Sequence, residues 1–183
     1  DIKGALPELY MIGLRNPQGM TISNEQILVT NHGAKGGDFL GALSSGGNYG
    51  WNEIGWGGTN YSGTKIGKGE PFRDDFNLPI ISWVPSIAPS GMVFVTSDIY
   101  PKLKNNLLIG SLKFEYLHLC VIDGNSVVKE EKLFNYFEIE SGKVKLTRKM
   151  PTKVNESNLP GRVRALKKNS AGLDCCQTPN GRN

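Results

Sequence analysis

Short apolar runs separated by turn residues dominate this chain, and almost no segment shows the periodicity of an amphipathic helix. Brief runs of alternating apolar and polar residues, bounded by Gly, Pro, Asn or Asp, are typical of β-strands. The pattern predicts strands over residues 10–14, 19–22, 27–30, 79–84, 92–96, 107–112, 116–122 and 126–133. We therefore expect an all-β protein with few or no helices.

The last two predicted strands are joined by a short polar segment around Asp123-Gly124. Asp-Gly tolerates the positive φ angles of a tight two-residue turn, so this segment predicts a β-hairpin. Neighbouring strands are then expected to pair antiparallel.

An internal repeat refines the fold class. The sequence PQGM at residues 17–20 and the sequence PSGM at residues 89–92 each lead into an apolar strand, and a Gly- and Trp-containing insertion at 46–77 lengthens the interval between them. A third, weaker copy begins at Arg162. Such repeats are typical of four-stranded β-propeller blades. At most three blades fit this length, fewer than the roughly four that close a ring.

Composition is consistent with one domain. The chain has 183 residues, of which 38% are hydrophobic and 23 are glycine, enough for a real core. We expect a single partial β-propeller domain over 1–183, with an insertion or basic loop at 135–161 and an atypical tail at 173–183. No apolar run approaches the roughly 18–20 residues of a membrane-spanning helix, so no membrane span is expected.

The net charge of +4 comes from one segment, because residues 143–168 hold nine Lys and Arg against the single Glu156. Aromatic residues do not interleave with these charges, so a solvated basic loop is favoured over a nucleic-acid-binding stripe. His118 lies between two leucines in strand alternation and is interpreted as structural or exposed. The cysteines, Cys120 and the adjacent Cys175 and Cys176, form no CxxC pair.

Candidate chemistry gathers around the predicted strand at 27–30. A cation and two amides precede it in RNPQGM at 15–20, and the glycine-rich segment HGAKGGD follows it at 32–38. Glycines allow the backbone to approach a ligand, and their carbonyl oxygens suit hard cations. An ordinary turn is the alternative, because Gly, Asn and Asp are also the common turn residues.

Five blocks in this order and spacing resemble the soluble aldose sugar dehydrogenases that use pyrroloquinoline quinone, the glucose/sorbosone dehydrogenase family. The blocks are RNPQGM at 15–20, NHGAKGGDF at 31–39, GGNYGW at 46–51, SWVPSIAPSGMVF at 82–94 and NNLLIGSLK at 105–113. The resemblance implies a six-bladed quinoprotein propeller, of which this chain would be the C-terminal part. It further implies oxidation of aldoses at the anomeric carbon to lactones, by hydride transfer to the quinone with calcium as Lewis acid.

The resemblance also assigns site residues, each at the position matching a family motif. The implied cofactor-binding residues are Arg15, Asn16, Gln18, His32, Ser86, Lys113, Arg162 and Arg164. The implied calcium ligands are the backbone carbonyls of Gly33 and Ala34, although the family usually has proline at position 34. The family's general base is a histidine, and neither His32 nor His118 matches it. We therefore expect the base upstream of this chain, and the fragment alone to be inactive.

Several alternatives stay open at this point. One is a non-catalytic propeller module that binds sugar or a protein partner, and another is a calcium-dependent, lactonase-like hydrolase. The hydrolase would use side-chain carboxylates, of which Asp38 is the only one in the glycine loop. The resemblance implies an aldose substrate, a periplasmic or secreted location and a homodimer of the full-length protein. It leaves the sugar and the electron acceptor open.

Overall fold

The computed structural model describes residues 4–23 and 25–133, together with the backbones of four later strands within 136–177. The elements among these residues are all strands, as predicted. Two compact units make up the chain, Asp1–Pro89 (unit 1) and Ser90–Asn183 (unit 2). The expectation of one domain over 1–183 stays a prediction. In the part of the chain described, no helix is long and apolar enough to cross a membrane.

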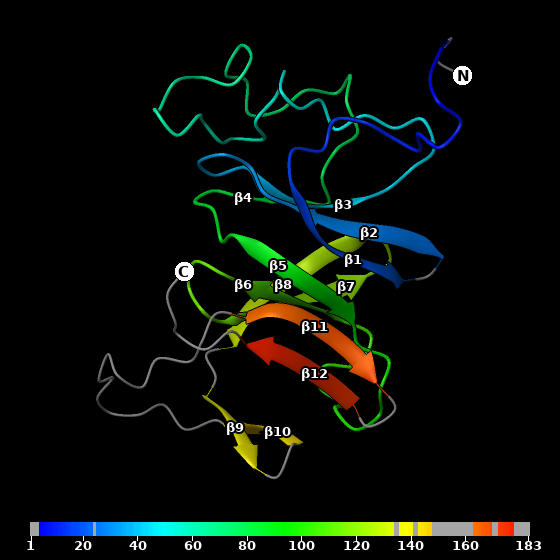
Figure 1. The fold of residues 1–183 in the computed structure, drawn as a ribbon, viewed down its shortest axis with the longest axis vertical. Helices are drawn as coiled ribbons and strands as arrows, with labels where there is room; N and C mark the ends of the chain where they lie inside the picture. Colours follow the sequence, from blue (N-terminus) through cyan, green and yellow to red (C-terminus); the bar gives the residue numbers. More distant parts are fainter. Residues whose placement is uncertain are drawn as a thin grey trace. The chain divides into compact units, whose positions relative to one another are not determined.

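Unit 1 contains a four-stranded antiparallel sheet in which each strand pairs with the next along the chain (Figure 1). Its strands are β1 (Pro17–Ser23), β2 (Gln26–Asn31), β3 (Asp38–Ala42) and β4 (Ile81–Trp83). Sequence reasoning missed β3, because this strand is buried along almost its whole length and does not alternate between apolar and polar residues.

The strand predicted at 10–14 does not form. Ile12 instead makes an isolated parallel bridge to Asn48, with its N–H 3.0 Å from the Gly47 carbonyl oxygen. The apolar residues of this segment pack against the insertion rather than entering a sheet, since Met11 and Leu14 contact a core cluster there. Periodicity alone could not separate these two outcomes.

The insertion between β3 and β4 supplies much of the core of unit 1. Phe39 of β3 packs with Tyr49, Ile54 and Trp56, all three of which belong to the insertion. The Tyr49 hydroxyl donates to the Ala42 carbonyl at 2.8 Å, and burial raises the pKa of Tyr49 to about 12. The insertion is therefore a packed part of unit 1.

A second four-stranded sheet forms from β5 (Pro89–Phe94), β6 (Leu107–Ser111), β7 (Leu117–Asp123) and β8 (Ser126–Leu133), in chain order. Unit 2 has its own apolar cluster, which includes Val95, Leu108 and Leu119. The repeat is thereby confirmed in structural terms, because PQGM opens β1 and PSGM opens β5. Each copy begins the first strand of a four-stranded sheet, as in propeller blades.

The predicted hairpin between β7 and β8 is confirmed, but its turn lies one residue later than expected. Asp123 pairs with Ser126, so Gly124 and Asn125 are the central residues. Gly124 has a φ of 57°, and Asn125 is not among the residues with positive φ. Glycine at the first central position is the pattern of a type II′ turn.

Two further antiparallel hairpins follow, β9 (Tyr136–Glu140) with β10 (Lys143–Thr147), and β11 (Val163–Asn169) with β12 (Gly172–Gln177). The first lies within the segment predicted as an insertion or basic loop. The second begins at the predicted third repeat. Part of the predicted tail, up to Gln177, belongs to β12, and its remainder lies outside the described residues.

Candidate functional site

The end of β2 anchors the RNPQG segment through one buried amide. The side-chain oxygen of Asn31 accepts hydrogen bonds from the backbone N–H groups of Arg15 and Asn16, at 3.0 and 2.8 Å. In return, the His32 N–H donates to the Asn16 carbonyl at 3.0 Å. Asn31 is buried, so these bonds fix the start of β1 against the start of the glycine loop. Sequence reasoning did not select Asn31, although it opens the NHGAKGGDF block.

The Arg15 guanidinium lies over the glycine loop. Its Nη1 donates to the Gly33 carbonyl at 2.9 Å, and its Nη2 to the Tyr61 hydroxyl at 3.3 Å. Its Cζ lies 5.4 Å from the Trp51 ring centroid and 5.6 Å from that of Tyr61, within cation–π range. Arginine has five N–H donors, and partners for two are seen among the described residues. A half-buried, oriented cation of this kind suits a carboxylate ligand.

Asp38 ties the glycine loop to the segment that follows β4. Its Oδ1 accepts the Gly33 N–H at 2.9 Å, while its Oδ2 accepts the Ala88 N–H at 2.8 Å and the Ser86 hydroxyl. The side chain is only 1% exposed. These donors all come from the chain itself, so Asp38 acts here as an internal brace. The Ser86 hydroxyl already donates its hydrogen bond to Asp38. A contact between the Ser86 oxygen and a cofactor stays a prediction.

The glycines of the loop allow close backbone packing. A Cβ on Gly33 would lie 2.0 Å from the Gly36 carbonyl oxygen, and one on Gly37 would lie 1.9 Å from that of Gly55. Lys35 exchanges two backbone hydrogen bonds with Thr59, at 2.9 and 3.0 Å. The sequence predicts that these glycines let the backbone approach a ligand or a metal. In the structure they let other backbone segments of the chain pack closely, and a side chain at these positions would push those segments away.

A cavity of about 10 Å³ lies beside this network, with Asn31, Gly33 and Trp51 in its wall. That volume is about what one water molecule requires. A quinone would therefore have to lie outside this cavity, and Arg15 contacts the cavity wall through its hydrogen bond to the Gly33 carbonyl.

Most of the predicted site residues meet in unit 1. Hydrogen bonds link Arg15, Asn16, Gln18, Gly33 and Ser86 into one network through Asn31 and Asp38, and His32 and Ala34 continue it along the chain. Gln18 takes part by donating to the Asn16 side-chain oxygen at 2.7 Å. His32 donates from Nε2 to the Pro89 carbonyl.

The other predicted site residues belong to unit 2. Lys113 is exposed after β6, with its ammonium 5.0 Å from the Phe114 ring centroid. Arg162 lies outside the described residues, and of Arg164 only the backbone is described, in β11. Their proposed contacts with a cofactor stay predictions.

Carbonyl oxygens in this loop have the chemistry that calcium prefers. The Gly33 carbonyl accepts Arg15 and retains a second lone pair, so it can also face a cation. Asp38 is a poorer ligand, because it is buried and already accepts three hydrogen bonds, from Gly33, Ala88 and Ser86. The residues present thus fit a calcium ion held by backbone oxygen atoms, with Arg15 as a competing cation.

The model of one protein family, Glucose / Sorbosone dehydrogenase, matches residues 1–147. The chain belongs to this family. As a glucose/sorbosone dehydrogenase family member, it is 37% identical over 134 residues to the aldose sugar dehydrogenase YliI of Escherichia coli strain K12. That alignment covers 71% of this chain and 36% of YliI. The chain therefore spans about a third of the length of this curated relative.

Solved structures of the family confirm the partial propeller fold. A crystal structure of a glucose dehydrogenase superposes with a TM-score of 0.76 at 29% identity, over 95% of this chain and 45% of that one. The pyrroloquinoline-quinone-bound aldose sugar dehydrogenase of Streptomyces coelicolor superposes with a TM-score of 0.52, over 86% of this chain and 35% of that one. At 20% identity the latter likeness shows the fold alone. This family member is thus an all-β propeller part that spans less than half of the solved chains.

Proposed function

We propose that unit 1 forms part of the cofactor face of a sugar dehydrogenase that depends on pyrroloquinoline quinone and calcium, and that oxidises aldoses at the anomeric carbon to lactones. The observation that carries this proposal is the Arg15 guanidinium, held by the Gly33 carbonyl and by two aromatic rings beside the glycine loop. The quinone bears three carboxylates, so a pocket for it needs fixed cations. Family membership supports the same assignment.

The chain's own residues would act by binding and orienting. Arg15 would pair with a carboxylate, and the half-exposed to exposed side chains of Asn16, Gln18 and His32 would offer further polar groups around it. Asn31 removes the conformational freedom of this segment before any ligand arrives, because it holds the Arg15 and Asn16 backbones. When bound, the quinone supplies the hydride acceptor and calcium supplies Lewis acidity at its reactive carbonyl.

The carbonyls of Gly33 and Ala34 are the proposed calcium ligands. Arg15 and the metal would then share the Gly33 oxygen, which places two cations close together. A quinone carboxylate bound by Arg15 would relieve that repulsion. We therefore expect calcium and quinone to bind cooperatively, each strengthening the other.

The general base is proposed to lie outside this chain. His32 already uses Nε2 on the Pro89 carbonyl, and His118 uses Nε2 on Glu130. A missing base typically costs about 10²- to 10⁴-fold in rate, and the rest of the cofactor pocket would be missing as well. The isolated chain is accordingly expected to show no normal turnover. Its periplasmic or secreted location and a homodimer of the full-length protein are further proposals from the resemblance.

A calcium-dependent hydrolase is the less favoured alternative. Such a site would hold its metal through side-chain carboxylates, and Asp38 is committed to the N–H groups of Gly33 and Ala88 and to the Ser86 hydroxyl. Turning the buried Asp38 side chain toward a metal would disturb these bonds. The dehydrogenase hypothesis places calcium on backbone carbonyl oxygens, which leaves the hydrogen bonds of Asp38 intact.

The test is a calorimetric titration of the protein with pyrroloquinoline quinone, in the presence and absence of calcium. Arg15→Met removes the cation but keeps an apolar stem against the rings. The matched control is Arg73→Met, since Arg73 is also a unit 1 arginine stacked on an aromatic ring, 4.5 Å from the Phe76 centroid. A charge-assisted hydrogen bond is worth about 1.5–3 kcal/mol, so Arg15→Met should weaken binding about 10- to 150-fold.

Each outcome separates the candidates. Calcium-dependent binding that weakens in Arg15→Met and not in Arg73→Met supports the proposal. Equal affinity in all three proteins would refute the role of Arg15. Saccharide binding without any quinone binding would favour the non-catalytic module instead.

A further inference from the structure

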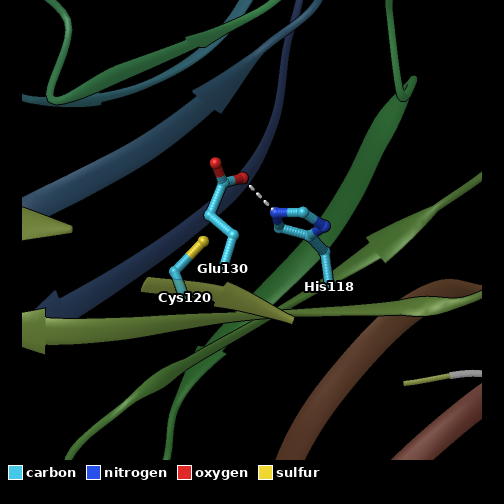
Figure 2. A group of neighbouring side chains, drawn as sticks. All are labelled: His118, Cys120 and Glu130. Carbon is cyan, nitrogen blue, oxygen red and sulfur yellow. Dashed lines mark hydrogen bonds and ion pairs between the residues drawn. The ribbon is translucent and has the colours of Figure 1, made fainter. Parts of the chain in front are cut away.

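Unit 2 holds a cluster of side chains that the sugar dehydrogenase site does not use. His118 and Cys120 are two residues apart on β7 and therefore point to the same face of the sheet. Glu130 of β8 lies directly opposite Cys120 in the strand register. Figure 2 shows the carboxylate and the imidazole joined by a hydrogen bond, with the sulfur on the same side. We call these three residues the β7–β8 triad.

We propose that the β7–β8 triad binds a zinc-like divalent transition-metal ion. One ligand atom from each residue, a sulfur, an imidazole nitrogen and a carboxylate oxygen, lies within 4.8 Å of the others. Thiolate, imidazole and carboxylate are the ligand types that zinc takes, and three protein ligands leave a fourth position for water. A thiolate in the set disfavours calcium and magnesium, which prefer oxygen.

Only small movements are needed to close such a site. In tetrahedral zinc sites with metal–ligand bonds of about 2.0–2.3 Å, the ligand atoms are about 3.3–3.5 Å apart. The widest separation in the β7–β8 triad is at most 4.8 Å, so it exceeds this spacing by no more than about 1.3 Å. Rotations of the Cys120 and Glu130 side chains can supply this change, and the Glu130 side chain is 34% exposed. The same exposure gives an ion a route from solvent.

Charge and burial favour occupation by a metal. His118 and Cys120 are buried, and a buried thiolate with a carboxylate would offset the two charges of the ion. Binding of a metal ion would displace the proton of the Cys120 thiol, as it does in other thiolate sites. A cation that adjoins the triad on β8 is Lys132, the cross-strand partner of His118. Its ammonium lies 5.8 Å from the Tyr116 ring centroid.

The experiment is a titration of the full-length expressed protein with cobalt(II). Cobalt replaces zinc in such sites, and its bond to a thiolate gives an intense near-ultraviolet absorption band. We expect one equivalent of cobalt to produce this band, and added zinc to remove it. Cys120→Ser should abolish the band, and Glu130→Gln should weaken cobalt binding at least tenfold.

The matched control is Glu131→Gln. Glu131 is the neighbour of Glu130 on β8, faces the other side of the sheet and pairs with Lys129. This variant should bind cobalt as the unaltered protein does. Zinc should raise the melting temperature of the unaltered protein and of Glu131→Gln, but not that of Cys120→Ser.

Three results would overturn the proposal. The first is the absence of a thiolate band, and the second is a band that survives in Cys120→Ser, which would assign it to another cysteine. The third is equal cobalt affinity in Glu130→Gln and Glu131→Gln. Because Glu130 is partly exposed, its glutamine variant tests the triad even where Cys120→Ser fails to fold.

Discussion

Replacing Asp38 by asparagine should destabilise unit 1 strongly. The substitution keeps the shape of the side chain but turns one acceptor oxygen into an NH₂ group. Asp38 accepts from donors on both of its oxygens, with Gly33 on one side and Ala88 and Ser86 on the other. Asparagine can accept on one side only. On the other side, a buried donor would face an NH₂ group that cannot accept its hydrogen.

The magnitude follows from counting these bonds. If the amide oxygen faces Ala88, the Gly33 N–H loses its partner, and an orphaned buried donor costs about 1–3 kcal/mol. The remaining hydrogen bonds change from charge-assisted to neutral, and together they lose at least about 1 kcal/mol of stabilisation. We therefore expect a loss of about 3 kcal/mol, a large share of a typical domain stability of about 5–15 kcal/mol.

Tryptophan fluorescence during urea unfolding is a suitable assay. All three tryptophans of the chain, Trp51, Trp56 and Trp83, belong to unit 1, so their emission reports that unit. Asp75→Asn is the control, because Asp75 is an exposed unit 1 carboxylate whose partner is Arg73. An Asp38→Asn midpoint no lower than that of Asp75→Asn would refute the bracing role of Asp38.

Three further predictions use the same chain. Gly37→Ala should destabilise unit 1 far more than Gly46→Ala in the urea assay, because both have φ near +70° but only Gly37 has a backbone oxygen 1.9 Å from the added Cβ; equal losses would contradict the packing argument. The free energy of unfolding should fall by about 2 kcal/mol as pH rises from 10 to 12, since a pKa raised to about 12 by burial keeps Tyr49 neutral when folded; Tyr49→Phe should flatten this fall. The isolated chain should self-associate in light scattering at micromolar concentration, because edge strand β1 exposes Met20 and Ile22, each 67% exposed; a monodisperse monomer would contradict this.

Sequence reasoning succeeded where the determining interactions are local. The strands with clear alternation were predicted to within a few residues, and the hairpin at Asp123 followed from turn chemistry. The repeat could be predicted because PQGM and PSGM occupy the same structural position, the opening of a first strand. β3 was missed because burial on both faces removes the alternation by which strands are recognised.

The candidate site was predicted only in part, because its decisive contacts join distant segments. RNPQG and the glycine loop could be identified as motifs. The contact between Arg15 and Tyr61 crosses 46 residues, and that between Ser86 and Asp38 crosses 48. No spacing rule predicts which residues of an insertion return to a strand end. Tyr61 and the bracing role of Asp38 therefore required the folded structure.

The insertion at 46–77 connects the fold to the proposed function. It carries Tyr49 and Trp56, which complete the core, and Trp51 and Tyr61, which hold the Arg15 guanidinium. The buried residues Tyr49 and Trp56 anchor this loop in the core, and with it the Trp51 ring that contacts Arg15, whereas Tyr61 is 72% exposed and is less firmly held. The cation is thus oriented by packing before any ligand binds. Preorganisation of this kind is what a binding face for a polyanionic cofactor requires.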